Sequence, residues 1–356
     1  MSDADDLADS LRRYDEVVGE YVEVHQRIRD GLPPARRKPR WWLPLAILSV
    51  LVLALPLGIL VGRAHLISPA PPLAPWPGPT NTGVPPGTTL TAWGGGCVIT
   101  TDNTVIDSKL VDCSVANGYE GSLTIHAANV TINKSSVKGI VVLDTDLPGS
   151  NNWSMSLTDS EVSAGLIAQA AVSAGNLTVL RSNIHGGATS VQCEYGNVDA
   201  GHICDIRDSW LHGQEMPDDQ PWHLGGFLSE GGVPAGVIKL IHNRVVCDHP
   251  VNLVNDGCSG DINLIPNVAA ISGVLIQNNI LGANVGASFC TYGGERSDKT
   301  WGHADHVTYK DNVFERGTNR LCGGYGPVNA FDVNGPGNQW INNTWEDDGT
   351  AVPPSL

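Results

Sequence analysis

The chain has 356 residues, of which 41% are hydrophobic and 16% are charged, and its formal net charge is −16. From Ala64 onward it contains 28 acidic and 12 basic residues, so this part carries the whole net charge. Such an excess of carboxylates argues against nucleic acid as a partner, because binding to nucleic acid requires basic patches.

Residues 1–40 are predicted to form a cytoplasmic tail with one amphipathic helix. Two interpretations of this helix stay open: self-association or docking to a partner, and a loosely helical, solvated tail. The short length and Gly19 make the helix marginal on its own. The predicted apolar stripe has heptad-like steps of four and three residues and consists of Leu7, Leu11, Tyr14, Val18, Tyr21, His25 and Ile28.

Residues 41–62 are predicted to form a transmembrane anchor. The 19 residues from Leu43 to Val61 carry no charge, and as a helix they would cover about 28 Å, which is enough to cross a bilayer. Four basic residues lie within 36–40, whereas only Arg63 directly follows the segment. This asymmetry predicts a cytoplasmic N-terminus and an exterior C-terminal domain. A cleaved signal peptide is the alternative, which the poor cleavage site around Gly62 disfavours.

Residues 63–87 are predicted to form a proline-rich linker that includes the run PAPPLAPWPGP. Such a stretch is typical of an extended, semi-rigid spacer between membrane and domain. A disordered connector without partners is the other interpretation.

Residues 88–356 are predicted to form an all-β solenoid of about nine coils. One short phrase recurs, in which an apolar anchor is followed three positions later by Ser or Asn, and its spacing of 22 to 36 residues is typical of a solenoid. The anchors should stack into a core, and the Ser or Asn should mark the bend between two strands. Asn tolerates left-handed backbone, and stacked Asn amides can hydrogen-bond from one coil to the next. The anchors are Val105, Ile132, Leu157, Val179, Ile206, Leu240, Ile276, Tyr309 and Trp340; the bend column is Ser108, Ser135, Ser160, Ser182, Ser209, Asn243, Asn279, Asn312 and Asn343.

Eight cysteines lie after the predicted anchor, and an even number confined there predicts disulfides formed in an oxidising exterior compartment. The sequence allows many pairings. Sequential pairing is the one we expect, because neighbouring cysteines then fall within one coil or its loop. The predicted pairs are Cys97 with Cys113, Cys193 with Cys204, Cys247 with Cys258, and Cys290 with Cys322.

Several runs resemble a family of exported actinobacterial proteins. They are PPGTTLTAWGGGCVITTDNTVIDSKLVDC, the pair SNIHGG and SWLHG, and the C-terminal run from NVFERG to AVPP. The resemblance covers residues 85–354 and implies a right-handed parallel β-helix of the pectate-lyase-like superfamily. That superfamily contains lyases, hydrolases, esterases and non-catalytic adhesins, so the fold does not select an activity.

One constellation of candidate site residues stands out. His185 and His212 hold the same position in consecutive coils, and Trp210 should share their face because strand side chains alternate. The insertion after His212 should bring further acidic and aromatic groups within reach of this surface, and two arginines stand near the bend. These candidates are Glu215, Asp218, Asp219, Trp222 and His223, with Arg181 and Arg207.

These residues predict a protein that acts on polysaccharide. In a lyase, His185 or His212 would be the base, and Arg207 or a Ca²⁺ ion on Asp218 and Asp219 would neutralise the developing charge. A hydrolase would instead use Glu215 with Asp218 or Asp219, and His223 is a further catalytic candidate. Sugar would stack on Trp210 and Trp222, with Arg181 beside them. The alternative is a non-catalytic glycan-binding or structural surface protein.

Overall fold

The computed structural model describes residues 75–114, 121–145, 147–193, 203–232 and 238–354, and residues 71–356 form one compact unit. The described part is all-β apart from one 3₁₀ turn, η1 (Ser150–Asn152). The predicted cytoplasmic helix and the apolar segment 43–61 lie outside the described residues. Within those residues, no helix is long and apolar enough to cross a membrane.

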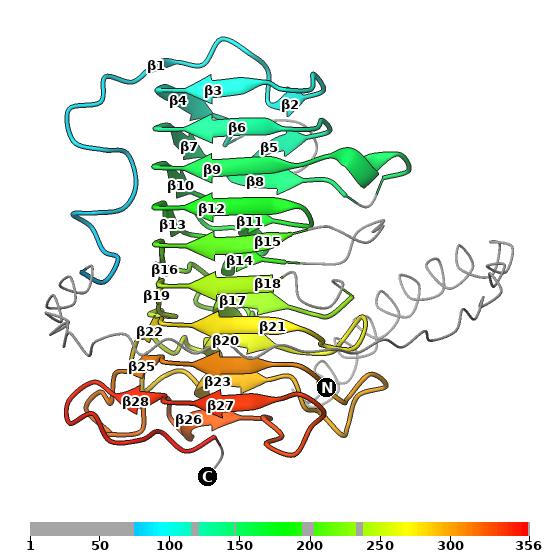
Figure 1. The fold of residues 1–356 in the computed structure, drawn as a ribbon. Coiled ribbons are helices and arrows are strands. Elements are labelled where there is room, and N and C mark those ends of the chain that lie inside the picture. Colours follow the sequence, from blue (N-terminus) through cyan, green and yellow to red (C-terminus); the bar gives the residue numbers. More distant parts are fainter. Residues whose placement is uncertain (1–74, 115–120, 146, 194–202, 233–237, 355–356) are drawn as a thin grey trace, which may run out of the picture. The chain divides into compact units, whose positions relative to one another are not determined.

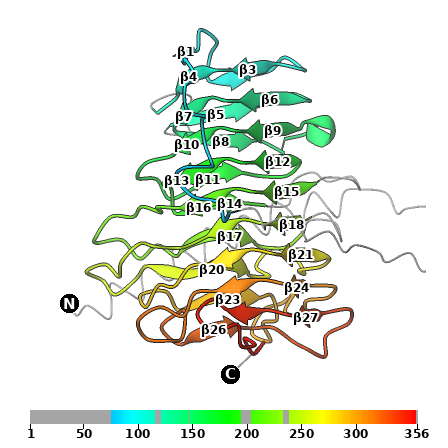
Figure 2. The same ribbon diagram turned by 60° about the vertical axis from the view of Figure 1, so that its left-hand side comes forward.

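The strands form three parallel sheets, and each coil of the chain contributes one strand to each sheet in the order B, C, A (Figures 1 and 2). Nine coils of three strands result, and β1 adds a tenth strand to the edge of sheet A. This arrangement fits a parallel β-helix. The right-handed sense implied by the resemblance stays a prediction.

Sheet A contains β1 (Thr91–Ala92), β4 (Lys109–Asp112), β7 (Ser136–Lys138), β10 (Glu161–Ser163), β13 (Asn183–His185), β16 (Trp210–His212), β19 (Arg244–Val245), β22 (Ile280–Leu281), β25 (Val313–Phe314) and β28 (Thr344–Trp345). Sheet B contains β2 (Val98–Ile99), β5 (Ser122–Ile125), β8 (Ile140–Leu143), β11 (Ala170–Ser173), β14 (Thr189–Gln192), β17 (Leu224–Ser229), β20 (Cys258–Leu264), β23 (Phe289–Gly293) and β26 (Gly326–Asn329). Sheet C contains β3 (Val105–Asp107), β6 (Val130–Asn133), β9 (Met155–Thr158), β12 (Leu177–Leu180), β15 (Cys204–Arg207), β18 (Ile238–Ile241), β21 (Val274–Gln277), β24 (Thr308–Lys310) and β27 (Gln339–Ile341).

The predicted anchors form a continuous inner column on sheet C, with one correction. From Ile132 to Tyr309 the anchors are fully buried and pair in register from coil to coil. In the first coil, however, Ile106 pairs with Ile132 and is buried, whereas Val105 is 59% exposed. The anchor in coil 1 is therefore Ile106, because a shift of one residue moves a strand side chain to the opposite face of its sheet.

The bend between sheets C and A also differs from the prediction. The left-handed residue is the one before the Ser or Asn, as at Arg181, Asp208 and His242. The Ser and Asn side chains point inward instead and are buried from Ser135 to Asn343. In coil 1, Ser108 itself is left-handed, so it aligns with Lys134 and not with Ser135.

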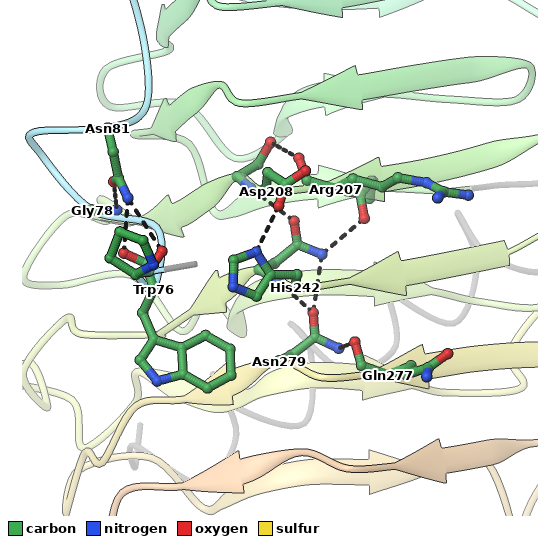
Figure 3. A network of polar contacts seen from close by, with 12 residues as sticks. Trp76, Gly78, Asn81, Arg207, Asp208, His242, Gln277 and Asn279 are labelled. Carbon is green, nitrogen blue, oxygen red and sulfur yellow. Dashed lines mark hydrogen bonds and ion pairs between the residues drawn. The ribbon is translucent and has the colours of Figure 1, made fainter. Parts of the chain in front are cut away.

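These inward side chains form a hydrogen-bonded ladder between coils. The Asn243 N–H donates to Asn279 Oδ1 over 2.8 Å, and the Asn279 N–H donates to Asn312 Oδ1 over 2.9 Å. Each Asn Nδ2 also donates to a main-chain carbonyl, as Asn279 does to Leu240 over 2.9 Å. Figure 3 shows the second such bond of Asn279, to Gln277 O over 3.1 Å. In the serine coils the hydroxyl accepts the equivalent N–H, as Ser182 does from Ser160. The ladder satisfies the polar groups that the bend would otherwise bury unpaired.

The four predicted disulfides are confirmed, each pairing neighbouring cysteines of the chain: Cys97–Cys113, Cys193–Cys204, Cys247–Cys258 and Cys290–Cys322. Three of them link positions only 11 to 16 residues apart. Cys193–Cys204 and Cys247–Cys258 each close one connection between two strands, whereas Cys97–Cys113 links the two ends of coil 1.

Residues 75–90, which we call the strap, lie along the C–A bend (Figure 3). The Trp76 ring stacks on the imidazole of His242 in coil 6, with 5.2 Å between ring centroids. The Gly83 N–H donates to the Arg181 carbonyl in coil 4 over 3.0 Å. Beyond the strap, β1 pairs with β4 in coil 1. The described part of the predicted linker thus packs against the solenoid and does not extend freely from it.

Candidate functional site

The two predicted histidines lie side by side on the outer face of sheet A. His185 in β13 pairs in register with His212 in β16, and their ring centroids are 5.5 Å apart. The Trp210 indole stacks on the His212 ring at 3.5 Å. The sequence-based placement of these three side chains on one face is therefore confirmed, because alternation along a strand and register between coils act together.

Each imidazole is held by a polar residue from the preceding coil. His185 Nε2 lies 3.1 Å from Glu161 Oε1, and His212 Nε2 lies 2.8 Å from Asn183 Oδ1. Sequence reasoning missed both partners. Glu161 and Asn183 hold the same outward position of the repeat, two residues before the histidine column, and this signal was sufficient to find them. We call these five residues the histidine face: Glu161, Asn183, His185, Trp210 and His212.

The charges on this face are fixed by its packing. Burial, reinforced by the electrostatic effect of the neighbouring His185, lowers the pKa of His212 to about 4. The hydrogen bond from His185 lowers the pKa of Glu161, and electrostatic attraction to the same imidazole acts in the same direction against the cost of burial. At neutral pH the face therefore carries a neutral His212 beside an ionised Glu161. The His212 Nε2–H donates to Asn183 Oδ1, which leaves Nδ1 without the proton.

One indole group on the face is unsatisfied. Among the residues that the structure describes, Trp210 Nε1 is buried and has no hydrogen-bond partner. Buried donors are nearly always paired in native proteins, and exceptions call for a specific explanation. Its position beside Asn183 and His212 concentrates polar groups on two adjacent strands, β13 and β16, which lie about 4.8 Å apart.

The predicted arginines lie elsewhere. Arg207 is on sheet C and binds Asp205 with two nitrogens, at 2.6 and 2.8 Å. Arg181 occupies the left-handed bend of coil 4 and binds Asp159 in the same bidentate manner, also at 2.6 and 2.8 Å. Both guanidinium groups are already engaged by carboxylates. Lys138 is the cation aligned with His185 on sheet A, because Ser163 of β10 pairs with His185 on one side and with Lys138 on the other.

The acidic insertion packs against the next loop. The Leu253 N–H donates to the Asp218 carbonyl over 3.1 Å, and His223 lies 3.6 Å from Asp256. Trp222 packs on a small buried cluster with the Cys247–Cys258 disulfide. Among the described residues, no hydrogen bond or ion pair joins Glu215, Asp218 or Asp219 to either histidine of the face.

The surroundings of Asp218 and Asp219 offer few ligands for calcium. In the part of the chain that the structure describes, the only three close His, Cys, Asp or Glu groups are Asp261, Cys290 and Cys322, and these cysteines form a disulfide. Asp218 and Asp219 are exposed and do not belong to such a group. Calcium prefers six to eight oxygen ligands, so two carboxylates alone fit it poorly and no step is derived through it.

Two further clusters combine histidine, acid and tryptophan. His126 bonds Asp144 at 2.9 Å and stacks on Trp153, and His242 bonds Asp208 at 2.6 Å and stacks on Trp76. In each, the histidine and the acid come from adjacent coils. An acid–histidine pair beside a tryptophan therefore serves as a connection between coils in this protein. The histidine face differs by its second imidazole and by the amide of Asn183.

A shallow depression of about 270 Å³ lies elsewhere, on sheet C. It contains none of the predicted catalytic or substrate-binding residues and is lined by Asn129, Val130, Thr131, Ser154, Met155, Ser156, Asn176, Thr178 and Ile203.

No protein-family model matches the chain, and no curated protein and no solved structure is detectably similar to it. The fold and the chemistry of its own side chains are therefore the basis for any functional conclusion.

Proposed function

We propose that the chain binds polysaccharide and that the histidine face on sheet A is the binding surface. The observation that carries this proposal is the in-register juxtaposition of Glu161, Asn183, His185, Trp210 and His212 on three adjacent strands. Sugars present apolar ring faces and hydroxyl edges. Aromatic rings pack on the former, and carboxylate and amide oxygens accept hydrogen bonds from the latter.

The direction of the bound chain follows from the solenoid. The face extends along the stacking direction, with the carboxylate on β10, the amide and one imidazole on β13, and the indole and the second imidazole on β16. A linear polymer lying across the strands would therefore meet one polar or aromatic group about every 4.8 Å. The large negative charge of the domain favours a neutral glycan over a polyanionic one.

A lyase is the second candidate, and the Glu161–His185 contact favours it. A carboxylate that holds Nε2 orients the imidazole and leaves Nδ1 free to accept a proton, as a general base requires. His212 is the poorer base because its pKa is about 4. Lys138, two coils or about 10 Å from His185, would neutralise a substrate carboxylate. Its side chain is 57% exposed, and its ammonium lies 3.9 Å from Asp112, from which a substrate carboxylate would have to draw it.

The location of the protein is proposed together with its function. A membrane anchor at 41–62 would place the solenoid outside the cell, and four disulfides without a free cysteine suit an oxidising compartment. Surface polysaccharide would then be the ligand within reach.

The test uses the full-length chain with a panel of neutral and acidic polysaccharides. Binding is measured first, and then unsaturated products by ultraviolet absorbance and new reducing ends. We expect saturable binding that Trp210→Ala and His185→Ala each weaken at least about tenfold, since each removes a direct contact. Unsaturated products that disappear in His185→Ala or Glu161→Gln would establish the lyase.

The chain offers a matched control for loss of packing. His126→Ala removes a histidine that also bonds an acid and stacks on a tryptophan. His126 directly follows β5 of sheet B and does not belong to the histidine face. We expect His126→Ala to leave glycan binding unchanged. Equal loss of binding in His126→Ala and His185→Ala, or no binding across the panel by folded protein, would refute the proposal.

A further inference from the structure

The loops that connect sheet A to sheet B expose an apolar surface. Three successive loops, 246–257, 282–288 and 315–325, follow strands β19, β22 and β25 (Figure 2). Each contributes exposed apolar side chains to this surface. Leu253 is 85% exposed and Tyr325 is 73% exposed. We call this set the loop patch: Val251, Leu253, Val254, Val285, Leu321 and Tyr325.

Hydrogen bonds hold these loops together as one surface. Asn284 Nδ2 donates to the carbonyls of Cys247 and His249, at 2.8 and 3.0 Å, and so joins the first two loops. The Gly324 N–H donates to Ala287 O over 2.6 Å, and the Tyr325 N–H donates to Ser288 O over 2.9 Å. The Cys247–Cys258 and Cys290–Cys322 disulfides tie two of the loops to sheet B. The loop patch is therefore presented on a braced framework.

Acidic groups border the patch on its coil 5 and coil 6 side. Loops 213–223 and 246–257 contain five carboxylates and no Lys or Arg, and the Leu253 N–H bonds directly to Asp218 O. The acids are Glu215, Asp218, Asp219, Asp248 and Asp256. On the other side, Arg316 and Arg320 are paired with Asp347 and Asp348. The surface thus combines exposed apolar side chains with a net negative border.

We propose that the loop patch is a docking surface for a polypeptide segment with apolar side chains flanked by lysine or arginine. Exposed apolar clusters on a soluble domain mark interaction sites, and complementary charge selects the partner. The acidic border disfavours an anionic lipid surface. It also disfavours a second copy of the chain, because a symmetric contact would bring like charges together. This inference goes beyond the proposed glycan binding and involves a different part of the solenoid.

The test uses three labelled synthetic peptides of equal length as probes for the full-length chain. The first alternates leucine with lysine, the second replaces lysine by glutamate, and the third replaces leucine by serine. We expect saturable binding of the leucine–lysine peptide only. The double variant Leu253→Ser, Val254→Ser should weaken it at least about tenfold. The pair Asp218→Asn, Asp219→Asn should weaken it and reduce its dependence on salt.

Val105→Ser is the matched control, because Val105 is 59% exposed on the opposite part of the solenoid, in β3 of sheet C. It should bind the peptide as the unmodified chain does. Equal binding of the lysine–serine peptide would show attraction of charge alone and would overturn the proposal. Sedimentation that reveals a dimer which Leu253→Ser dissociates would also overturn it, since a second copy would then cover the patch.

Discussion

Replacement of Asn279 probes the ladder inside the solenoid. Its side chain is fully buried and accepts both the N–H and the Nδ2–H of Asn243, at 2.8 and 3.0 Å. It also donates to Leu240 O over 2.9 Å and to Asn312 Oδ1 over 3.0 Å. Asn279→Ala leaves the buried Asn243 N–H without its acceptor, and it removes the Nδ2–H group that donates to Leu240 O. An unsatisfied buried group costs about 1–3 kcal/mol, so the free energy of unfolding should fall by about 3 kcal/mol.

Asn279→Ser is expected to lower the free energy of unfolding less, by about 2 kcal/mol in total. A serine hydroxyl at this column already accepts the N–H of the previous coil, as Ser209 does from Ser182 at 3.1 Å. The assay is equilibrium denaturation with guanidinium chloride, followed by circular dichroism, and exposed Asn334→Ala serves as the control. A loss below about 0.5 kcal/mol in Asn279→Ala, comparable to an ordinary surface substitution, would refute the reasoning. Equal losses in the alanine and serine variants would refute the role of the acceptor.

Three further predictions concern acid, the strap and a disulfide. The pKa of His212 is lowered from 6.5 to about 4 in the folded chain, so the unfolded chain binds more protons in that window and stability falls as the pH drops from 6.5 to 4. The full shift would correspond to about 3 kcal/mol of stability, and solvent screening at this half-buried site reduces it to about 1–2 kcal/mol. In urea titrations the free energy of unfolding of His212→Gln should therefore fall by that much less than that of the unmodified chain between pH 7 and pH 4. Identical losses in the two proteins would contradict the lowered pKa of His212. Trp76→Ala removes the stack on His242 and should make the strap sensitive to limited proteolysis while β1 to β28 stay intact; an unchanged cleavage pattern would show that the stack does not anchor the strap. Replacing Cys247 and Cys258 by serine opens an 11-residue link and should cost about 3 kcal/mol in thermal or chemical unfolding, whereas a loss near zero would mean that the loop framework holds without the covalent link.

The repeat was readable because it reflects the physical demands of each coil. An inward apolar residue such as Ile132 must meet the same position one coil later, and this requirement leaves a period in the sequence. The same period predicted that His185 and His212 would be neighbours. The sequential disulfides followed from short spacing alone.

The wrong predictions, on the coil 1 anchor and on the left-handed residue of the bend, concern positions where a shift of one residue changes which side chain faces inward. In coil 1, Val105 and Ile106 are both apolar, and only the pairing with β6 decides which one faces inward. At the bend, both Asp208 and Ser209 favour turns, and the buried ladder decides that Ser209 faces inward and that Asp208 takes the left-handed backbone.

The partners of the candidate site were harder to predict because they depend on contacts between coils. Glu161 is 24 residues before His185 and was overlooked in favour of acids adjacent in sequence to His212. The positions of Arg181 and Arg207 required knowledge of the sheet on which each lies. The anchoring of the strap by Trp76 leaves no periodic signal, because it is a single contact between an irregular segment and the solenoid.

The most direct test of polysaccharide binding at the histidine face is hydroxyl-radical footprinting of the full-length chain with and without a bound polysaccharide. Mass spectrometry would report oxidation of individual histidine and tryptophan side chains. We predict that the ligand reduces oxidation of His185, Trp210 and His212, whereas His303, whose side chain is 92% exposed, and Trp301, which is 41% exposed, stay unchanged. Protection confined to other residues, with the histidine face oxidised as in the free protein, would contradict the proposal.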